Sequence, residues 1–434
     1  MAEENVTDAA WRKILENHPD IIKTVRAGGV YEIPAAKIKE YREPRLMTKH
    51  DTSEMVPAPL KSEKLNVLPI SRSTYAISDF VLFEQFPDVS EIHPKLRTLP
   101  DFETLTADNI TSESNAINAL IASEILDDFL GTENTVETFN GRMGSGNFSF
   151  HVNRKNGTPA LIDVRGAQLE IDGGFENDDS VIIMEAKNVR HSDFHIRQLY
   201  YPYRKYRELI DKPIRLIFSQ YTNMTYYLYE YTLDVPEDYN SLRHLRTEAY
   251  TFEDSRITAS ELRDALTSTR KITDDNQNHT RIPFIQADRF DRVISLMERL
   301  TNEPEGLTTE EIANFLGTVE RQASYYPAAG EYLGLFDRRE RGCTKLTKKA
   351  QDILELNLRE RRIALAKSMF EHEILRRCFF KAFTTGKIPT VEDVIPWMAE
   401  LNVCNPGEND SMYKRRAQSV IAWTRWLMSL VDDE

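Results

Sequence analysis

The sequence is poor in cysteine and has neither a long apolar run nor a leader-like N-terminus. Its three cysteines, Cys343, Cys378 and Cys404, show no CxxC or Cys/His ligand spacing, which argues against a disulfide framework or a zinc site. No stretch of about eighteen apolar residues predicts a membrane span, and the first residues lack the basic and apolar segments of a signal peptide. We therefore expect a cytoplasmic protein with no membrane partner.

A nucleotide-binding motif and a surplus of positive charge are also missing. The glycine-rich loop at residues 144–146 could bring backbone N–H groups to a phosphate, but no Gly-Lys-Ser/Thr follows it, so no nucleotide cofactor is expected. The net charge of −14 argues against indiscriminate coating of nucleic acid. Residues 337–381 depart from this balance, with 13 basic against 7 acidic side chains. The composition therefore still allows a local surface that binds nucleic acid.

Two predicted strands bring carboxylates to one end of a sheet. Residues 168–172 alternate between polar and apolar, and residues 181–184 form the continuous apolar run of a buried strand. Side by side, these strands place Asp172 near Glu185, with Lys187 on the same face as Glu185. Two carboxylates in a small volume repel each other unless a cation lies between them, and hard oxygen ligands suit Mg²⁺ or Mn²⁺. The lysine could orient or deprotonate a water molecule.

The spacing of these residues carries a resemblance to a known family. Asp172, followed after an apolar strand by Glu185-Ala-Lys187, resembles the PD-(D/E)XK nuclease signature, although no proline precedes Asp172. A helix predicted over residues 193–210 carries Gln198, and this superfamily often places a glutamine at that point. The resemblance implies an α/β (α+β) restriction-endonuclease-like core with a mixed central sheet.

The resemblance also implies a chemistry, which is the Mg²⁺-dependent hydrolysis of phosphodiester bonds in double-stranded DNA. Asp172, Glu185 and the Ala186 carbonyl would hold the metal, for which Mn²⁺ can substitute, and Lys187 would position the water. Gln198 would orient the site. Asp172, Glu185, Lys187 and Gln198 are therefore the expected catalytic residues.

A further carboxylate belongs to the implied site. Glu124 lies in a helix predicted over residues 113–130, on an apolar stripe where a carboxylate is costly unless it is paired or bound to a metal. Many nucleases of this superfamily place a glutamate on the helix before the first catalytic strand, and Glu124 matches that role. The alternative is that Glu124 reaches solvent at the edge of the stripe, and Glu170 is the other candidate for the extra acidic residue.

The last third of the chain predicts a winged-helix arrangement. Residues 288–300, 307–317 and 319–335 are predicted helices, and residues 338–346 form a basic strand and turn. In a winged helix the third helix enters the major groove of DNA. Such modules also serve protein interaction or dimerisation, so this alternative stays open.

Basic and polar side chains in two regions are candidate DNA contacts, because such groups bind phosphates and base edges. In the winged-helix region the candidates are Arg321, Gln322, Ser324, Tyr325, Arg338, Arg339 and Arg341. Near the start of the chain they are Arg42, Arg45 and Lys49, although a solvated loop explains that cluster equally well.

The chain is expected to form three regions. Residues 1–110 are an N-terminal α/β region that could contact DNA, residues 111–280 are the nuclease core, and residues 281–434 are a winged-helix region with room for two modules. The turn-rich residues 273–280 mark the last border.

This plan resembles type II restriction endonucleases, and cutting both strands favours a homodimer. Three alternatives stay open. The chain could be a DNA-repair or structure-specific nuclease on the same core, or a winged-helix regulator with an inert core. It could also be a protein that uses the winged helix for dimerisation and does not bind DNA.

Overall fold

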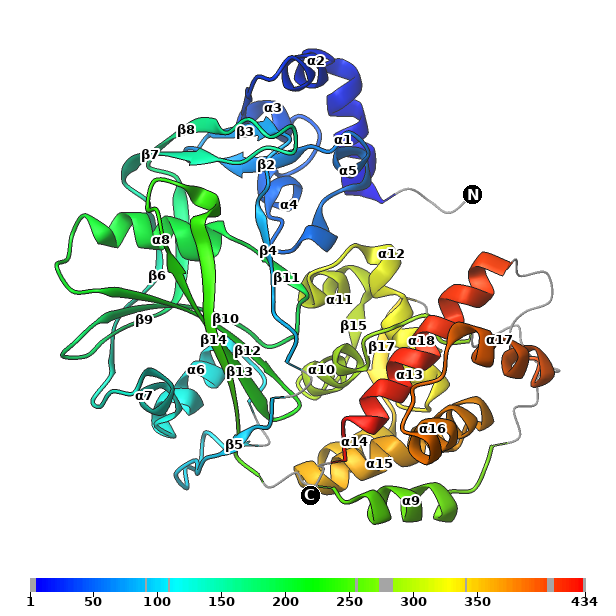
Figure 1. The fold of residues 1–434 in the computed structure, drawn as a ribbon. Coiled ribbons are helices and arrows are strands. Elements are labelled where there is room, and N and C mark those ends of the chain that lie inside the picture. The colour runs from blue at the N-terminus through cyan, green and yellow to red at the C-terminus, as the bar shows by residue number, and fades with distance from the viewer. Residues whose placement is uncertain are drawn as a thin grey trace.

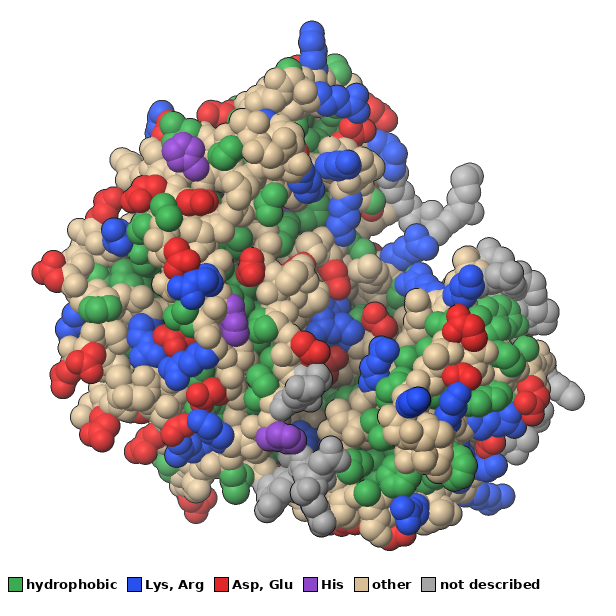
Figure 2. Space-filling model, in the orientation of Figure 1, with side chains coloured by type: hydrophobic (Ala, Val, Ile, Leu, Met, Phe, Trp, Pro, Cys, Tyr) green, Lys and Arg blue, Asp and Glu red, His purple; other side chains and the backbone are tan. Residues whose placement is uncertain are grey.

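The computed structural model describes residues 5–89, 92–107, 110–253, 257–272, 284–339, 342–403 and 410–431. The predicted linker at residues 273–280 and Arg341 lie outside these ranges. The N-terminal part, a central sheet and a helical C-terminal part follow one another along the chain (Figure 1). On the face shown in Figure 2, acidic and basic side chains are interspersed, so no extended patch of one sign marks a partner there.

A seven-stranded mixed sheet forms the centre of the fold, with strand order β5-β14-β13-β12-β10-β9-β6. Its strands are β5 (Lys95–Leu96), β6 (Val136–Gly144), β9 (Gln168–Glu176), β10 (Val181–Lys187), β12 (Ile214–Thr222), β13 (Thr225–Leu233) and β14 (Leu242–Thr251). Strand β10 pairs in parallel with β12 and antiparallel with β9. The predicted mixed α/β architecture is thus confirmed.

Helices cover both faces of this sheet. The α6 helix (Glu113–Ala122) and the α7 helix (Ile125–Leu130) share one apolar cluster with Ile182 and Met184 of β10. The α8 helix (Arg197–Arg207) shares the opposite cluster with Ile183. Because successive strand residues point to opposite faces, the apolar run of β10 supplies both clusters, as its composition predicted.

The single helix predicted over residues 113–130 is wrong. The Ser123 hydroxyl donates to the Ala119 carbonyl (2.6 Å), and Glu124 adopts a left-handed conformation with φ of 56°. A serine that bonds back to the preceding turn competes with the regular helix, and the left-handed residue then redirects the chain. Glu124 is consequently exposed at the start of α7 and is not part of the apolar stripe.

The N-terminal part packs around the buried ring of Trp11, whose Nε1 donates to the Met47 carbonyl (2.9 Å). Three antiparallel strands in the order β1-β3-β2 flank this core. The elements are α1 (Val6–Asn17), α2 (Asp20–Arg26), β1 (Tyr31–Pro34), α3 (Ala35–Lys39), α4 (Pro44–Thr48), η1 (Ser53–Met55), α5 (Ala58–Ser62), β2 (Asn66–Pro69) and β3 (Thr74–Ser78). Two further strand pairs join this part to the core: β4 (Phe83–Gln85) with β11 (Asp193–His195), and β7 (Asn147–Val152) with β8 (Ala160–Arg165).

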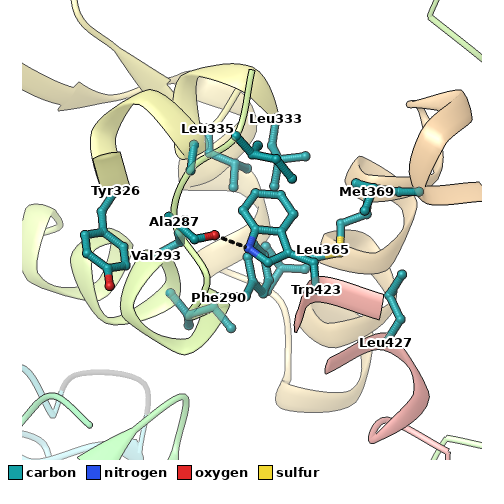
Figure 3. Packing of buried hydrophobic residues seen from close by; sticks show 14 of the residues in the cluster. Ala287, Phe290, Val293, Tyr326, Leu333, Leu335, Leu365, Met369, Trp423 and Leu427 are labelled. Atoms are coloured by element: carbon teal, nitrogen blue, oxygen red, sulfur yellow. Dashed lines mark hydrogen bonds between the residues drawn. The ribbon is translucent and has the colours of Figure 1, made fainter. Parts of the chain in front are cut away.

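The C-terminal part has a core of its own around the buried indole of Trp423, whose Nε1 donates to the Ala287 carbonyl (2.8 Å; Figure 3). The elements are α9 (Ala259–Ser268), α10 (Phe290–Leu300), β15 (Leu307–Thr308), α11 (Thr309–Leu316), α12 (Glu320–Ala323), α13 (Tyr325–Tyr332), β16 (Phe336–Asp337), β17 (Cys343–Leu346), α14 (Lys348–Leu354), α15 (Leu358–Phe370), α16 (Glu373–Thr385), α17 (Val391–Glu400) and α18 (Asp410–Met428). Within the described ranges, no helix combines the length and the hydropathy needed to cross a membrane.

The predicted third helix of this part, residues 319–335, is divided in the structure. A break at Ser324 separates the short α12 from α13, and Pro327 lies in the first turn of α13. Proline is tolerated in a first turn because the N–H it lacks would have no partner inside the helix. Strands β15, β17 and β16 form a small antiparallel sheet beside these helices.

Gly317 joins the three parts of the chain at one point. It ends α11 in a left-handed conformation, with φ of 61°, and its carbonyl accepts a hydrogen bond from the Thr52 hydroxyl (2.6 Å). A Cβ atom at this position would lie 2.6 Å from Cε1 of the buried His191 ring. The N-terminal part and the loop after β10 are thus packed directly against the end of α11.

Gly317→Ala should therefore destabilise the protein more than an equivalent change at an open site. Gly386 provides the matched control, because it also caps a helix, with φ of 67°, and a Cβ atom added there would have no described atom within 4 Å. Both changes cost about 1–2 kcal/mol for the left-handed backbone, and Gly317→Ala adds at least about 1 kcal/mol for the collision with His191. Thermal unfolding of the two variants measures the difference. Equal midpoints would contradict the tight packing at Gly317.

Candidate active site

Strands β9 and β10 separate where the acidic residues lie. Their antiparallel ladder ends at the pair Met184 and Gly173. Beyond this pair the Ala186 N–H donates to Oδ2 of Asp172 (3.0 Å), so a side chain takes over from the backbone ladder. This hydrogen bond holds Asp172 against the end of β10, as the predicted strand pairing required.

Four oxygen atoms surround the Lys187 ammonium group. Its Nζ atom lies 2.7 Å from Oε1 of Glu185 and 2.8 Å from the Ala186 carbonyl oxygen. It also lies 3.4 Å from Oδ2 of Asp172 and 3.3 Å from Oε1 of Glu113. These contacts come from β9, β10 and the first turn of α6. One cation thus holds three carboxylates and a carbonyl together at the edge of the sheet.

Gln198 connects this cluster to helix α8. Its Nε2 donates to Oε1 of Glu185, the same oxygen that accepts from Lys187. Its own Oε1 is buried without a hydrogen-bond partner. Because Gln198 is near the start of α8, the helix fixes the orientation of Glu185 from the face opposite α6. The structure therefore brings Asp172, Glu185, Ala186, Lys187 and Gln198 together.

Burial shapes the protonation of this cluster. Burial, and then the neighbouring Asp172 carboxylate, raises the pKa of Glu185 to about 8, even though Lys187 acts in the opposite direction. Burial also raises the pKa of Glu113. Burial alone would lower the pKa of Lys187, but Glu185 and Asp172 raise it well above its usual value. Lys187 therefore stays positively charged at neutral pH, and burial favours the protonated form of Glu185 when no metal is bound.

The cluster opens into a cavity of about 510 Å³ whose other walls carry cationic side chains. These are Arg45, Lys49, Arg72, Arg142 and Arg197. Lys49 pairs with Asp51 (3.2 Å) and Arg142 with Glu170 (3.0 Å). Within the described part of the chain, Arg45 and Arg72 form no ion pair. The cavity therefore has acidic groups at its base and unpaired positive charge on the side formed by the N-terminal part.

The carboxylate of this helical segment that contacts Lys187 is Glu113, and Glu124, the predicted extra acidic residue, lies outside the cluster. Glu124 is exposed because the helix breaks at Ser123, whereas Glu113 in the first turn of α6 reaches Lys187. Glu170, the other candidate, lines the cavity but pairs with Arg142. The signal for Glu113 was its position directly after the predicted N-cap Ser112, which does accept the Asn115 N–H (3.1 Å).

Sequence reasoning also missed three groups that line the cavity, Asp51, Arg72 and Arg197. Burial acts to raise the pKa of Asp51, but Lys49, Lys187 and Arg197 together lower it, so Asp51 carries a negative charge beside the lysine. Asp51 and Arg72 lie in loops without hydrophobic periodicity. No local pattern therefore marked them, and only the tertiary fold brings them to the site.

The predicted N-terminal DNA contacts divide into two groups. Arg45 and Lys49 line the cavity. Arg42 instead donates to the Thr7 hydroxyl and pairs with Glu310 of α11 (3.3 Å). It thereby joins the N-terminal part to the C-terminal part, and it does not line the cavity.

The predicted contacts on α12 and α13 remain near the surface. Arg321 and Gln322 are exposed, and Gln322 Oε1 accepts a hydrogen bond from Thr318 (2.6 Å). Ser324 donates to the Arg321 carbonyl (2.8 Å). The ring of Tyr325 lies 4.8 Å from the Arg415 guanidinium. These side chains are accessible, but they belong to a different surface from the cavity at Lys187.

The arginines of the predicted wing are engaged by carboxylates. Arg338 pairs with Glu331 (3.4 Å), and Arg339 Nε donates to Asp337 (2.8 Å). Arg341 lies outside the described residues. The positive surplus of this stretch is thus partly neutralised within the fold, and a phosphate would have to compete with these ion pairs.

The oxygen donors around Lys187 suit a hard divalent cation. Carboxylate and carbonyl oxygens are the ligands that Mg²⁺ prefers, and Asp172, Glu185 and Ala186 supply them at one point. Among the described residues, no three His, Cys, Asp or Glu side chains are already arranged as metal ligands. The Lys187 ammonium now holds these oxygens. The donor set therefore fits the metal that the motif implies, provided that Lys187 moves aside.

Family models match most of the chain, but they assign no activity to it. Residues 8–77, 78–251 and 292–432 match three family models, each described as a domain of unknown function (DUF6996, DUF6997 and DUF7226, respectively). No curated protein and no solved structure matches the chain. The cluster at Lys187 and most of its cavity fall within residues 78–251, and Arg45, Lys49 and Arg72 come from the segment before it.

The raised pKa of Glu185 predicts a stability that falls as pH rises. Folded Glu185 keeps its proton up to about pH 8, whereas the unfolded chain releases it near pH 4.5. The stabilisation is therefore complete below about pH 4.5 and is lost as pH rises through about 8. Glu185→Gln removes this dependence because glutamine does not titrate. In the presence of a chelator, the variant should gain at least about 2 °C in melting midpoint relative to wild type between pH 5 and pH 9.

Glu124→Gln is the control for this measurement, because Glu124 is exposed and does not contact the cluster. Its melting midpoint should follow that of the wild type across the same range. A Glu185→Gln curve parallel to the wild-type curve would show that Glu185 is ionised in the folded protein.

Proposed function

We propose that the chain is a Mg²⁺-dependent, sequence-specific endonuclease of double-stranded DNA with a PD-(D/E)XK core, as in type II restriction enzymes. The observation that carries this proposal is the set of oxygens from Asp172, Glu185 and Ala186 gathered around Lys187 at the end of two strands. Helices on both faces of the mixed sheet support a restriction-endonuclease-like core.

The side chains of the cluster account for several parts of phosphodiester hydrolysis. In this reaction a water oxygen bonds to phosphorus, the bond to the leaving sugar oxygen breaks, and negative charge grows on the phosphoryl oxygens. Mg²⁺, held by Asp172, Glu185 and the Ala186 carbonyl, would supply Lewis-acid polarisation of the phosphate. Lys187 stays protonated, so it donates hydrogen bonds to the water and to a phosphoryl oxygen and does not act as the base.

Glu113 is the carboxylate placed to accept the proton of the attacking water. It contacts Lys187 (3.3 Å), and its side chain is 44% exposed, compared with 9% for Glu185. A substrate water can therefore reach Glu113 more easily than it reaches Glu185. Burial raises the pKa of Glu113, and a carboxylate with a raised pKa is a better base near neutral pH.

The positively charged side of the cavity supports DNA as the substrate. Arg45 and Arg72 extend from the N-terminal part without ion pairs to other described residues, and guanidinium groups bind phosphates strongly. We further propose that α10 to α13 with strands β15 to β17 form a winged helix that contacts DNA through Arg321 and Gln322. Cleavage of both strands favours an enzyme with two active sites, so we propose a homodimer.

Asp172→Ala and Lys187→Ala should each abolish cleavage. Loss of the ligand or of the donor removes stabilisation of the developing charge, which corresponds to at least about a 100-fold loss of rate. Plasmid DNA incubated with Mg²⁺, followed by sequencing of the ends, measures the activity and identifies the cleaved sequence. Both variants should still bind DNA when Ca²⁺ replaces Mg²⁺. Cleavage at the wild-type rate by either variant would refute the site.

Glu113→Gln should lower the cleavage rate at least about 10-fold, because glutamine can neither accept a proton nor carry the negative charge beside Lys187. Glu124→Gln is the matched control, since it makes the same chemical change in a neighbouring helix away from the cluster. Its rate should equal that of the wild type. If Glu124→Gln were slower than the wild type and Glu113→Gln were not, Glu124 and not Glu113 would belong to the active site.

A further inference from the structure

A second, larger cavity lies between the sheet and the helical C-terminal part. Its volume is about 790 Å³, within the range of ligand-binding sites in proteins. Thr222, Asn223 and Thr225 at the end of β12 and the start of β13 form part of its wall. Cavities at the carboxyl ends of parallel strands are common ligand sites in α/β proteins. In Figure 2, basic and acidic side chains are both visible along the recess between the sheet and the C-terminal helices.

Four arginines from four separate segments line this second cavity, and we call it the arginine cavity. They are Arg190 after β10, Arg289 before α10, Arg362 in α15 and Arg425 in α18. Guanidinium groups are always charged and repel one another unless anions lie nearby. Their convergence from four segments is therefore unfavourable without a counterion.

The carboxylates in the arginine cavity do not balance this charge completely. Three carboxylates, Glu253, Asp288 and Asp291, line the cavity beside the four arginines. Asp291 pairs with Arg289 at 3.8 Å, and Glu253 accepts the N–H of Leu358 at the start of α15. Arg289 still has one buried guanidinium nitrogen, Nη1, without a hydrogen-bond partner. Arg425 is exposed and forms no ion pair with any residue in the described ranges. Donors thus remain for an anionic ligand.

Aromatic rings lie beside these donors. The Arg190 guanidinium lies 5.0 Å from the centre of the Tyr227 ring. Trp426 is half-buried and packs against Phe290 with ring centres 4.5 Å apart. Arginines that bind phosphates, next to aromatic surfaces that contact sugars or bases, are typical of nucleic-acid sites.

The arginine cavity is close to the candidate active site along the chain. Arg190 follows Lys187 by three residues, so at most about 10 Å of backbone separates them. A DNA strand advances about 3.4 Å per nucleotide along the duplex axis. The backbone separation of Lys187 and Arg190 thus corresponds to about three nucleotides of one DNA strand.

We propose that the arginine cavity binds the phosphodiester backbone of the DNA strand that continues from the cleaved phosphate. The inference rests on the proposed function for the identity of this ligand. A free nucleotide offers the same chemistry, a phosphate beside a planar base. The experiment therefore has to distinguish a nucleic-acid strand from a nucleotide.

Arg425→Ala provides the test, because Arg425 is exposed and its replacement leaves no buried group without a partner. Binding of a fluorescently labelled 30-base-pair duplex is measured by anisotropy in Ca²⁺ over a series of salt concentrations. Arg425→Ala should weaken binding about 3- to 10-fold and reduce the slope of log affinity against log salt by about one. Arg207→Ala is the matched control, since Arg207 is an exposed arginine that lines neither cavity, and it should bind as the wild type does.

Cleavage by the wild type and competition with ATP show whether the nuclease proposal or the present inference fails. If the wild type cleaves DNA and Arg425→Ala binds as tightly as Arg207→Ala, the inference is overturned and the nuclease proposal stands. If the wild type does not cleave but shows binding that depends on Arg425, the inference stands and the nuclease proposal fails. Displacement of the duplex by millimolar ATP at constant ionic strength would assign the cavity to a nucleotide and overturn its assignment to a DNA strand.

Discussion

The arrangement around the sheet edge depends on one electrostatic constraint, the need of buried carboxylates for a cation. Asp172 and Glu185 are brought together by the pairing of β9 and β10, and removing carboxylates from water is costly unless positive charge accompanies them. Lys187 satisfies this need in the structure by contacting both carboxylates, Glu113 and the Ala186 carbonyl. The same geometry that places the lysine among these oxygens also creates the set of ligands that a divalent cation could use.

Much of the core could be predicted from local patterns, because those patterns report burial. The alternation in β9 and the apolar run of β10 correctly predicted two adjacent strands, and the two-residue period placed Lys187 beside Glu185. Glu124 was expected beside the cluster because the helical pattern continues through Ser123, but one hydroxyl bond and a left-handed residue end the helix there and leave Glu124 exposed. Asp51 and Arg72 could not be predicted, since only long-range packing of irregular segments brings them to the cavity.

The distribution of charge in the fold differs from the distribution along the sequence. Many basic residues of the C-terminal part already form ion pairs or hydrogen bonds within the fold. Arg377 pairs with Glu400 (2.7 Å), and Arg376 donates to the carbonyl of Leu266 (2.8 Å). Arg45 and Arg72, from the acidic half of the chain, line the candidate site without an ion pair to any other described residue. A count of lysines and arginines therefore indicates where cations are abundant but not where they can bind a phosphate.

The contact between Thr52 and Gly317 has a consequence for biosynthesis. It joins residues that are 265 positions apart, so a chain emerging from the ribosome exposes Thr52 long before its partner exists. Until α11 has been made, the segment that carries Lys49 and Asp51 lacks this anchor. In the nuclease that we propose, the active site would be completed only after most of the chain has been synthesised, which would spare the cell's own DNA from partly synthesised copies.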